Sequence, residues 1–427
     1  MHRLTVFTFL LILSACKPGS GPANEVPESY EEYTRVPLHS TAEGVQPMTG
    51  IVIWSDSAGS HNDSYALEYS YMRYNDVCKG KDVYDWSPVE KVLSQAASRG
   101  HQTVLRFYYV YVGKQCTVPD YIKALPDYEE TSGKSEGRMT YFPDWRNAEL
   151  QRFHLDFYCR FAEKFDNDPR LAYLETGFGL WAEYHIYEGP FIKGKTFPSM
   201  DFQAEFFRGM QKWFIHTPWM ISIDAADGKY GPFRLHSELL DIPFGNFDDS
   251  FMCSDHDGYN RESWLFFGAE RYKTSPLGGE FSYYTDFDQK HCLDKEGMYG
   301  RTFEDEVAKF HMTFIIGNDQ PRYQSWERIA EASKSMGYHF KVNDFRVLEG
   351  TGAAVQIENT GVAPIYHDAF LEADGVAGSN YNLRDLMPGE SVWVMIPNPS
   401  VSASPSLTIA CSRLIDGQKI GFDAEVE

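Results

Sequence analysis

Hydrophobic and polar positions follow two alternating patterns along most of the chain after residue 49. Short apolar runs rich in β-branched and aromatic residues indicate buried strands, and segments whose apolar residues recur every three or four positions indicate amphipathic helices. The predicted strands cover 50–54, 66–74, 103–112, 171–174, 219–224, 247–253, 277–284 and 312–318. The predicted helices lie near 87–100, 150–167, 201–214, 233–240, 261–272, 302–311 and 325–336.

This alternation predicts the fold of residues 49–337. Strands that are joined through helices run parallel, and eight of them favour a closed barrel, so we expect an α/β fold of the (β/α)8 TIM-like type. A doubly wound open sheet is the alternative, but no GxGxxG sequence follows the first strand, which disfavours it. The segment 113–146 has neither pattern, and its length predicts a functional or mobile loop.

The pattern changes near Gly337. Val355 and Ile357, and later Val392 and Val394, alternate with outward-facing residues, which is typical of strands with one buried face. Residues 338–427 are therefore predicted to form a small C-terminal antiparallel β-sandwich.

The first residues have the features of an export signal. A short basic start precedes an apolar run over 4–13 that ends in Ser-Ala-Cys at Cys16, which predicts a bacterial lipoprotein signal peptide over 1–16 with Cys16 as the lipidated residue. An ordinary secretory signal with an incidental cysteine is the alternative. Residues 17–48 are rich in Pro, Gly and Ser and predict a flexible tether. We expect a lipid-anchored protein of the bacterial cell envelope, periplasmic or on the outer surface.

Composition and charge narrow the class of ligand. The formal net charge of −22 and the lack of any Lys/Arg run argue against a nucleic-acid partner, since the phosphate backbone needs clustered cations. The aromatic content of 15% suggests either a cleft that stacks against flat ligand faces or a large aromatic core. No Cys/His spacing suggests zinc, so we expect neither a metal nor another cofactor.

Six cysteines follow Cys16. An exported chain can form disulfides, and bridges within the pairs Cys78 and Cys116 and Cys253 and Cys292 are possible. The sequence leaves their connectivity open.

Two glutamates occupy the positions where a barrel carries its chemistry. Glu183 follows the fourth predicted strand in the run LAYLETGFGLWAEYHIYE, and Glu280 ends the seventh. Sites form at the carboxyl ends of barrel strands, and strands four and seven face each other across the mouth. Retaining glycosidases use two such carboxyls, about 5–5.5 Å apart. We therefore predict Glu183 as acid/base and Glu280 as nucleophile. Trp181 and Tyr184 would supply an apolar setting for Glu183, and Arg106 would be the cation near Glu280.

Other residues near strand ends are candidates for holding a sugar. Besides the two glutamates, the predicted substrate-binding residues are Trp54, Tyr71, Arg106, Trp181, His185, Asp224, Asp249 and Asn318. Trp54, Tyr71, Trp145 and Trp181 are candidate stacking platforms for a sugar, and core packing is the alternative for each ring. Helix capping is the alternative for the two aspartates, and packing is the alternative for His185. Glu175 rivals Glu183, although its position within a strand favours a structural ion pair. The Asp255-His256-Asp257 run could hold a metal, and a solvated loop is the favoured alternative.

Several blocks together resemble a known family. They are YDWSPVEKVLSQAASRGHQTVLRFYYVYVGK, PDWRNAELQRF, FDNDPRLAYLETGFGLWAEYH, GGEFSY and MGYHFKV, and the resemblance covers roughly residues 50 to 400. The chain is similar to a bacterial family of exported proteins of unknown function, which itself resembles the clan of retaining β-glycosidases that includes the β-galactosidases. The resemblance implies the same roles for Glu183 and Glu280. One departure is Ala182, which stands where that clan usually has an Asn that contacts the sugar 2-hydroxyl.

The sequence thus predicts a glycoside hydrolase that acts with retention on a β-linked oligo- or polysaccharide. The first alternative is a surface glycan-binding lipoprotein that uses the barrel without turnover, and a structural envelope protein is the second. The expected partners are a carbohydrate and, through Cys16, a membrane.

Overall fold

A computed structural model describes residues 26–57, 63–377 and 380–427 of the chain. The predicted signal peptide 1–16, including Cys16, and the first part of the predicted tether lie outside the described residues. Among the helices that the structure describes, none combines the length and the apolar character needed to cross a bilayer.

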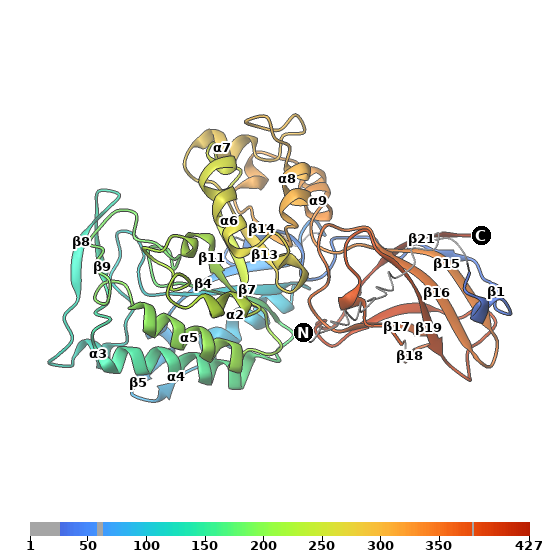
Figure 1. The fold of residues 1–427 in the computed structure, drawn as a ribbon, viewed down its shortest axis with the longest axis horizontal. Helices are drawn as coiled ribbons and strands as arrows, with labels where there is room; N and C mark the ends of the chain where they lie inside the picture. The colour runs from blue at the N-terminus through green and yellow to red at the C-terminus, as the bar shows by residue number, and fades with distance from the viewer. Residues whose placement is uncertain (1–25, 58–62, 378–379) are drawn as a thin grey trace, which may run out of the picture.

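Eight parallel strands close into a barrel (Figure 1). The closure is made where Phe314 and Ile316 of the last strand pair with Gly50 and Val52 of the first. In chain order the strands are β3 Gly50–Trp54, β4 Leu67–Arg73, β7 Gln102–Tyr108, β10 Leu171–Thr176, β11 Trp219–Ser222, β12 Gly245–Phe251, β13 Leu277–Phe281 and β14 Phe314–Ile316. The predicted (β/α)8 fold is confirmed, and each strand lies within or overlaps its predicted range.

Helices follow most of these strands, as the 3.6-residue pattern predicts. The α-helices of the barrel connections are α1 Tyr74–Val77, α2 Ser87–Ala97, α3 Asp120–Lys123, α4 Ala148–Phe165, α5 Met200–Trp213, α6 Arg261–Phe267, α7 Asp286–His291, α8 Phe303–Phe310 and α9 Trp326–Lys334. The predicted helix at 233–240 is wrong, because a short 3-10 segment, η3 Ser237–Asp241, lies there instead. Pro232 and Pro243 flank this stretch, and a proline disfavours the α conformation in the residue that precedes it.

The segment 113–146 is more ordered than a long loop. Besides α3 it contains a hairpin of β8 Thr131–Ser135 and β9 Arg138–Phe142. Glu136 and Gly137 form its two-residue turn with φ of 49° and 70°, as the turns that suit hairpin twist require. A smaller hairpin joins β5 Cys78–Gly80 to β6 Val83–Tyr84.

Two sheets form the C-terminal sandwich. The larger has the order β19-β16-β15-β21-β2 with β1 also paired to β15, and the smaller has the order β18-β17-β20. Their strands are β15 Phe340–Leu348, β16 Gly352–Asn359, β17 Ala369–Ala373, β18 Val376–Ala377, β19 Ser391–Pro397, β20 Leu407–Cys411 and β21 Phe422–Val426. Val355, Ile357 and Val394 are buried in the sandwich core, as predicted. The predicted alternation is wrong for β16, because Ala354 and Gln356 on its other face are buried as well. The strands pair antiparallel except β15 with β21, which run parallel.

Two short strands within the predicted tether 17–48 belong to this sandwich. β1 Thr34–Arg35 pairs with β15, and β2 Leu38–His39 pairs with β21. An edge strand offers unpaired backbone groups, so a segment with no apolar period can still add to it. A flexible tether is therefore wrong for these residues.

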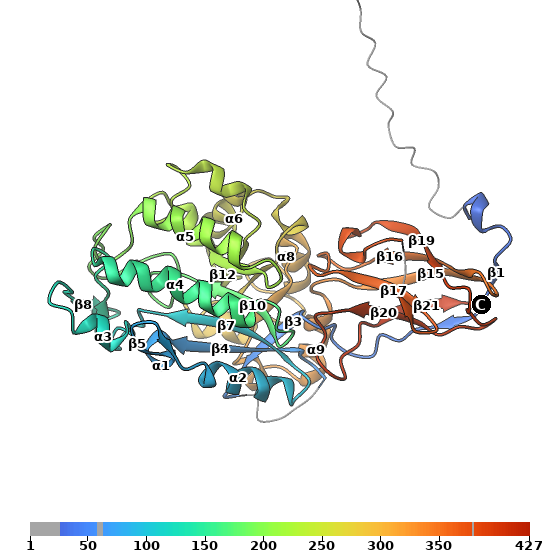
Figure 2. The ribbon, with the colours of Figure 1, turned by 90° about the horizontal axis from the view of Figure 1, so that it is seen from below.

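The sandwich covers one end of the barrel (Figure 2). Arg413 donates from Nη2 to the carbonyl of Leu171 at 2.8 Å, and its own carbonyl accepts from Gln102 Nε2 at 2.8 Å. Leu171 and Gln102 are the first residues of β10 and β7. The carboxyl ends of the strands, where barrel sites form, therefore lie at the far end, beside the β8–β9 hairpin.

The six cysteines in the described residues are free thiols. The sulfur of Cys78 contacts the carbonyl of Gly80, and that of Cys292 contacts the carbonyl of Gln289. The two disulfides considered from the sequence do not form.

Candidate active site

A cavity of about 1000 Å³ opens at the carboxyl end of the barrel. It gathers residues from loops that are far apart in the sequence. Nine predicted site residues line it, namely Trp54, Tyr71, Trp181, Glu183, His185, Asp224, Asp249, Glu280 and Asn318. Arg106, the tenth, lies fully buried beneath it.

A tight loop after β10 presents Glu183. The backbone amides of Phe178 and Gly179 both donate to the carbonyl of Glu183, at 3.1 and 2.8 Å. A Cβ on Gly177 would overlap the carbonyl of Ala182, and one on Gly179 would overlap the carbonyl of His185. The two glycines in the sequence are therefore needed for the loop to fold back on itself.

The turn before Glu183 is strained. Trp181 and Ala182 both have left-handed backbones, with φ of 58° and 57°, a conformation that costs about 1–2 kcal/mol for most residues. The carbonyl of Trp181 accepts from Arg106 Nη1 and from the Tyr71 hydroxyl, each at 3.2 Å. These bonds fix the strained turn, which sets the direction of Glu183.

Arg106 forms the floor of the cavity. Its Nε donates to Glu175 at 2.7 Å, its Nη1 donates to Asp249 at 2.6 Å, and its Cζ lies 4.1 Å from the ring centre of Phe247. Burial disfavours the guanidinium charge, but Asp249 and Glu175 raise the pKa of Arg106 well above its usual value. Glu175 is thus a partner in a buried ion pair, as its strand position predicted.

Glu280 projects from β13 and has a different environment from the one expected. The ion pairs of Arg106 are made with Glu175 and Asp249, so the arginine does not pair directly with Glu280. The Oε1 atom of Glu280 is buried without a hydrogen-bond partner among the described residues. Burial, and next the charge of Asp249, raise the pKa of Glu280 well above its usual value.

Glu183 is exposed to the same kind of negative charges as Glu280, but the His185 imidazolium lies beside it. Burial raises the pKa of Glu183 to about 7, against the lowering effect of His185. Glu183 in turn contributes to the raised pKa of Glu280. The two carboxyls therefore interact electrostatically, and the pKa of each is raised.

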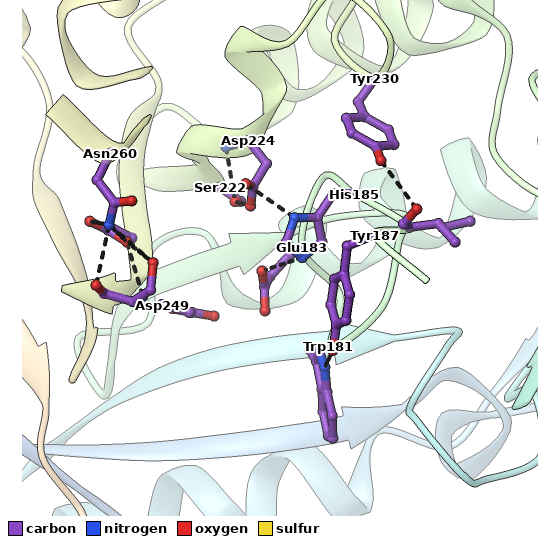
Figure 3. A network of polar contacts seen from close by, with 12 residues as sticks. Trp181, Glu183, His185, Tyr187, Ser222, Asp224, Tyr230, Asp249 and Asn260 are labelled. Carbon is purple, nitrogen blue, oxygen red and sulfur yellow. Dashed lines mark hydrogen bonds and ion pairs between the residues drawn. The ribbon is translucent and has the colours of Figure 1, made fainter. Parts of the chain in front are cut away.

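His185 lies between two carboxylates (Figure 3). Its Nε2 is 3.0 Å from Glu183 Oε2, and its Nδ1 is 3.1 Å from Asp224 Oδ1. These three residues are also the group within the described chain whose donor atoms lie close enough, within 4.8 Å, to suggest a metal. Both ring nitrogens face a carboxylate from opposite edges of the ring, which is the geometry of an ion-pair chain rather than of ligands directed at one central ion.

Aromatic rings form much of the wall and the rim. Trp181 packs edge-on against Tyr111 with ring centres 4.4 Å apart. Tyr283 and Tyr284 line the rim and are 50% and 71% exposed. Exposed rings at a cavity rim can stack against sugar faces. Trp145, by contrast, is fully buried in the barrel core, so the platform role considered for it is wrong.

The structure adds residues that the sequence did not single out. They are Tyr111, Glu136, Asp227, Tyr230, Asp248, Tyr259, Tyr283, Tyr284, Asp319 and Arg322 among others. Glu136 comes from the hairpin, where it accepts a hydrogen bond from the Tyr187 hydroxyl. The sequence held one signal for these residues: Tyr283 and Tyr284 follow Glu280 by three and four positions, so they could be expected near the same strand end.

The Asp255-His256-Asp257 run is neither a metal site nor a solvated loop. His256 is fully buried, with Nε2 at 3.3 Å from Glu306. Asp257 faces outward to Arg301 and Lys309. Neighbouring side chains on this π-helical turn point to different surroundings and do not converge.

Comparisons with known proteins give distant structural likenesses. No family model and no curated protein matches the chain. Endo-glycoceramidase II from Rhodococcus sp. is similar with 9% identity over 86% of this chain and 98% of that one, at a TM-score of 0.41. Xylanase A of P. fluorescens subsp. cellulosa is similar with 10% identity over 68% of this chain and 98% of that one, at a TM-score of 0.39. Xylanase 10B from Thermotoga maritima is similar with 12% identity over 62% of this chain and 81% of that one, at a TM-score of 0.38.

Proposed function

We propose that the protein is a retaining glycoside hydrolase that cleaves a β-linked oligo- or polysaccharide. The observation that carries this proposal is the pair Glu183 and Glu280, which comes from barrel strands four and seven and lines one cavity with aromatic walls. An acid that must hold its proton near neutral pH needs an environment that disfavours its charge, and the pKa values of both carboxyls are raised in this cavity.

Each glutamate takes one role in the proposed reaction. Glu183 gives its proton to the leaving oxygen while the Glu280 carboxylate attacks the anomeric carbon. Glu183 then takes a proton from the water that hydrolyses the glycosyl-enzyme bond, which its pKa of about 7 suits. Glu280 must first lose its proton, so turnover is expected to fall in acid as Glu280 becomes protonated.

The sugar hydroxyls need contacts other than residue 182. The Ala182 side chain is 1% exposed and does not line the cavity. Trp54 Nε1 is buried, has no hydrogen-bond partner among the described residues and belongs to a cavity-lining side chain. Trp54 is therefore the proposed donor to a substrate hydroxyl, with Asn318 beside it, since Asn318 Oδ1 accepts from the Trp54 amide at 3.1 Å.

The second candidate is a glycan-binding protein without turnover. The exposed Tyr283 and Tyr284 at the rim favour it, because stacking platforms serve a binder as well as an enzyme. We further propose that lipid at Cys16 holds either form at the bacterial cell envelope.

Hydrolysis of a panel of neutral plant, algal and host β-linked oligosaccharides tests the proposal. The purified protein is compared with Glu183→Gln and Glu280→Gln, and with Glu188→Gln as a matched control, since Glu188 is exposed in the same loop outside the cavity. Turnover that both cavity variants abolish, with binding kept, supports the hydrolase. Binding without turnover in the unmodified protein supports the binder. Turnover that survives either cavity substitution would overturn the two roles.

A further inference from the structure

His185 is held on both sides in a way that a sugar-binding role alone does not explain. Its Nε2 contacts Glu183 at 3.0 Å and its Nδ1 contacts Asp224 at 3.1 Å (Figure 3). His185 Nε2 makes no hydrogen bond within the described residues, and both contacts are ion pairs. An imidazole whose two nitrogens are occupied in this way has little capacity left to bind a ligand.

Asp224 is itself firmly anchored. The Ser222 hydroxyl donates to Asp224 Oδ2, the Tyr259 hydroxyl donates to Oδ1 at 3.1 Å, and the Asp224 amide donates back to Ser222 Oγ at 3.2 Å. Asp224 is 7% exposed. The far end of the chain of contacts is therefore fixed in position.

The imidazole ring has little freedom to rotate. The ring of Tyr187 packs edge-on against it at 4.9 Å and that of Tyr230 at 6.3 Å. The backbone carbonyl of His185 accepts from Leu180 at 2.9 Å, which ties it to the Glu183 loop. A rigid ring between a fixed aspartate and Glu183 restricts where the Glu183 carboxyl can lie.

We propose that Asp224 and His185 are positioning residues, which hold the Glu183 carboxyl in place and supply a fixed positive charge beside it. This inference rests on the proposed function of Glu183 as acid/base. Ser222 ends β11 and Asp224 follows it, so these two residues act on a residue that follows β10. Neither Asp224 nor His185 needs to touch the reacting atoms.

The charges around the three residues give this arrangement its purpose. Burial disfavours the imidazolium, but Asp224 and Glu183 raise the pKa of His185 well above its usual value. The groups that face Glu183 are His185, which lowers its pKa, and Asp249 and Asp224, which raise it together with burial. Without the imidazolium the pKa of Glu183 would lie higher, so less of it would be in the carboxylate form that the second step needs as its base.

The pH dependence of turnover separates this role from simple packing. In His185→Gln the lowering charge is gone, so the basic limb of kcat/KM, which reports protonated Glu183, is expected to move up by ~1 pH unit or more, the usual effect of an opposite charge within contact distance. His236→Gln is the matched control, because His236 also pairs with an aspartate, Asp201 at 3.1 Å, outside the cavity. A basic limb that stays in place in His185→Gln would overturn the proposal.

A second measurement does not depend on turnover. In the intact protein the His185 ring, followed by nitrogen NMR and assigned by its loss in His185→Gln, is expected to stay protonated well above the usual histidine pKa. In Asp224→Asn its pKa is expected to fall by ~1 unit or more. A ring that titrates near 6.5 in the unmodified protein, unchanged in Asp224→Asn, would overturn the proposal. If no glycan is turned over but the NMR result is as expected, the hydrolase proposal is contradicted. The ion-pair chain of Asp224, His185 and Glu183 is then still supported.

Discussion

Replacing Arg106 is expected to destabilise the barrel strongly. The fully buried guanidinium donates to Glu175, Asp249, the Tyr71 hydroxyl and the Trp181 carbonyl. Arg106→Met keeps the length of the side chain but leaves two carboxylates without their cation. Breaking a buried ion pair from one side costs about 3–5 kcal/mol. At about 2–3 °C per kcal/mol for a large domain, the barrel should melt about 6–15 °C lower.

The cost should depend on pH in a fixed direction. Burial raises the pKa of Glu175 to about 7 although Arg106 lowers it, so losing Arg106 raises this pKa further. A carboxyl whose folded pKa lies above its unfolded value loses stability as pH rises between the two. The deficit of Arg106→Met is therefore expected to be smaller at pH ~5, where Glu175 is protonated in both proteins, than at pH ~8.

Denaturant unfolding followed by tryptophan fluorescence at both pH values measures this deficit. Arg106→Lys, which keeps the charge and loses the planar fork, should give an intermediate loss. Arg208→Met is the control, because Arg208 and its partner Glu238 are both more than half exposed and surface pairs contribute little. A deficit for Arg106→Met below ~1 kcal/mol, or one equal at both pH values, would refute the reasoning, since it would mean that the carboxylates are not buried charges.

Three further predictions concern the loops, the second carboxyl and the domain contact. Gly177→Ala should abolish turnover with the fold kept by circular dichroism, because a Cβ there overlaps the Ala182 carbonyl; unchanged kcat would contradict this. Glu280→Gln should be more stable than the unmodified protein, by a margin that grows from pH ~5 to ~8. The reason is that the raised pKa of Glu280 makes its negative charge costly as pH rises. Urea unfolding measures the margin, and a margin that shrinks as pH rises would contradict the prediction. Arg413→Ala should separate the melting of sandwich and barrel in calorimetry, since Arg413 bonds the Leu171 carbonyl; one unshifted transition would show that this contact does not couple them.

The sequence by itself determined most of the barrel. The order and type of its strands followed from local apolar period, and strict alternation with helices left parallel pairing as the natural outcome. That also placed Glu183 and Glu280 at the same end, because the carboxyl ends of parallel strands share one edge. The strand positions of Trp54 and Asn318 brought them to the cavity for the same reason.

Weak local signals account for the elements that were missed. The hairpin that carries Glu136 turns at Glu136-Gly137, which lacks the Asn or Asp that marks most such turns. β1 and β2 are two residues long and show no period of their own. They exist because the sandwich offers them open edges, which no pattern within 34–39 reveals.

The charge relations of the site were decided only by the tertiary structure. Sequence spacing put Arg106 near the mouth and suggested that it balances Glu280, yet its ion pairs are with Glu175 and Asp249. In the same way, His185 acquires its second partner, Asp224, only through the closure of β10 against β11. Local sequence fixes which strand a residue follows. The pKa of a buried carboxyl depends instead on which charges lie within a few ångströms, and that is settled when distant loops pack together.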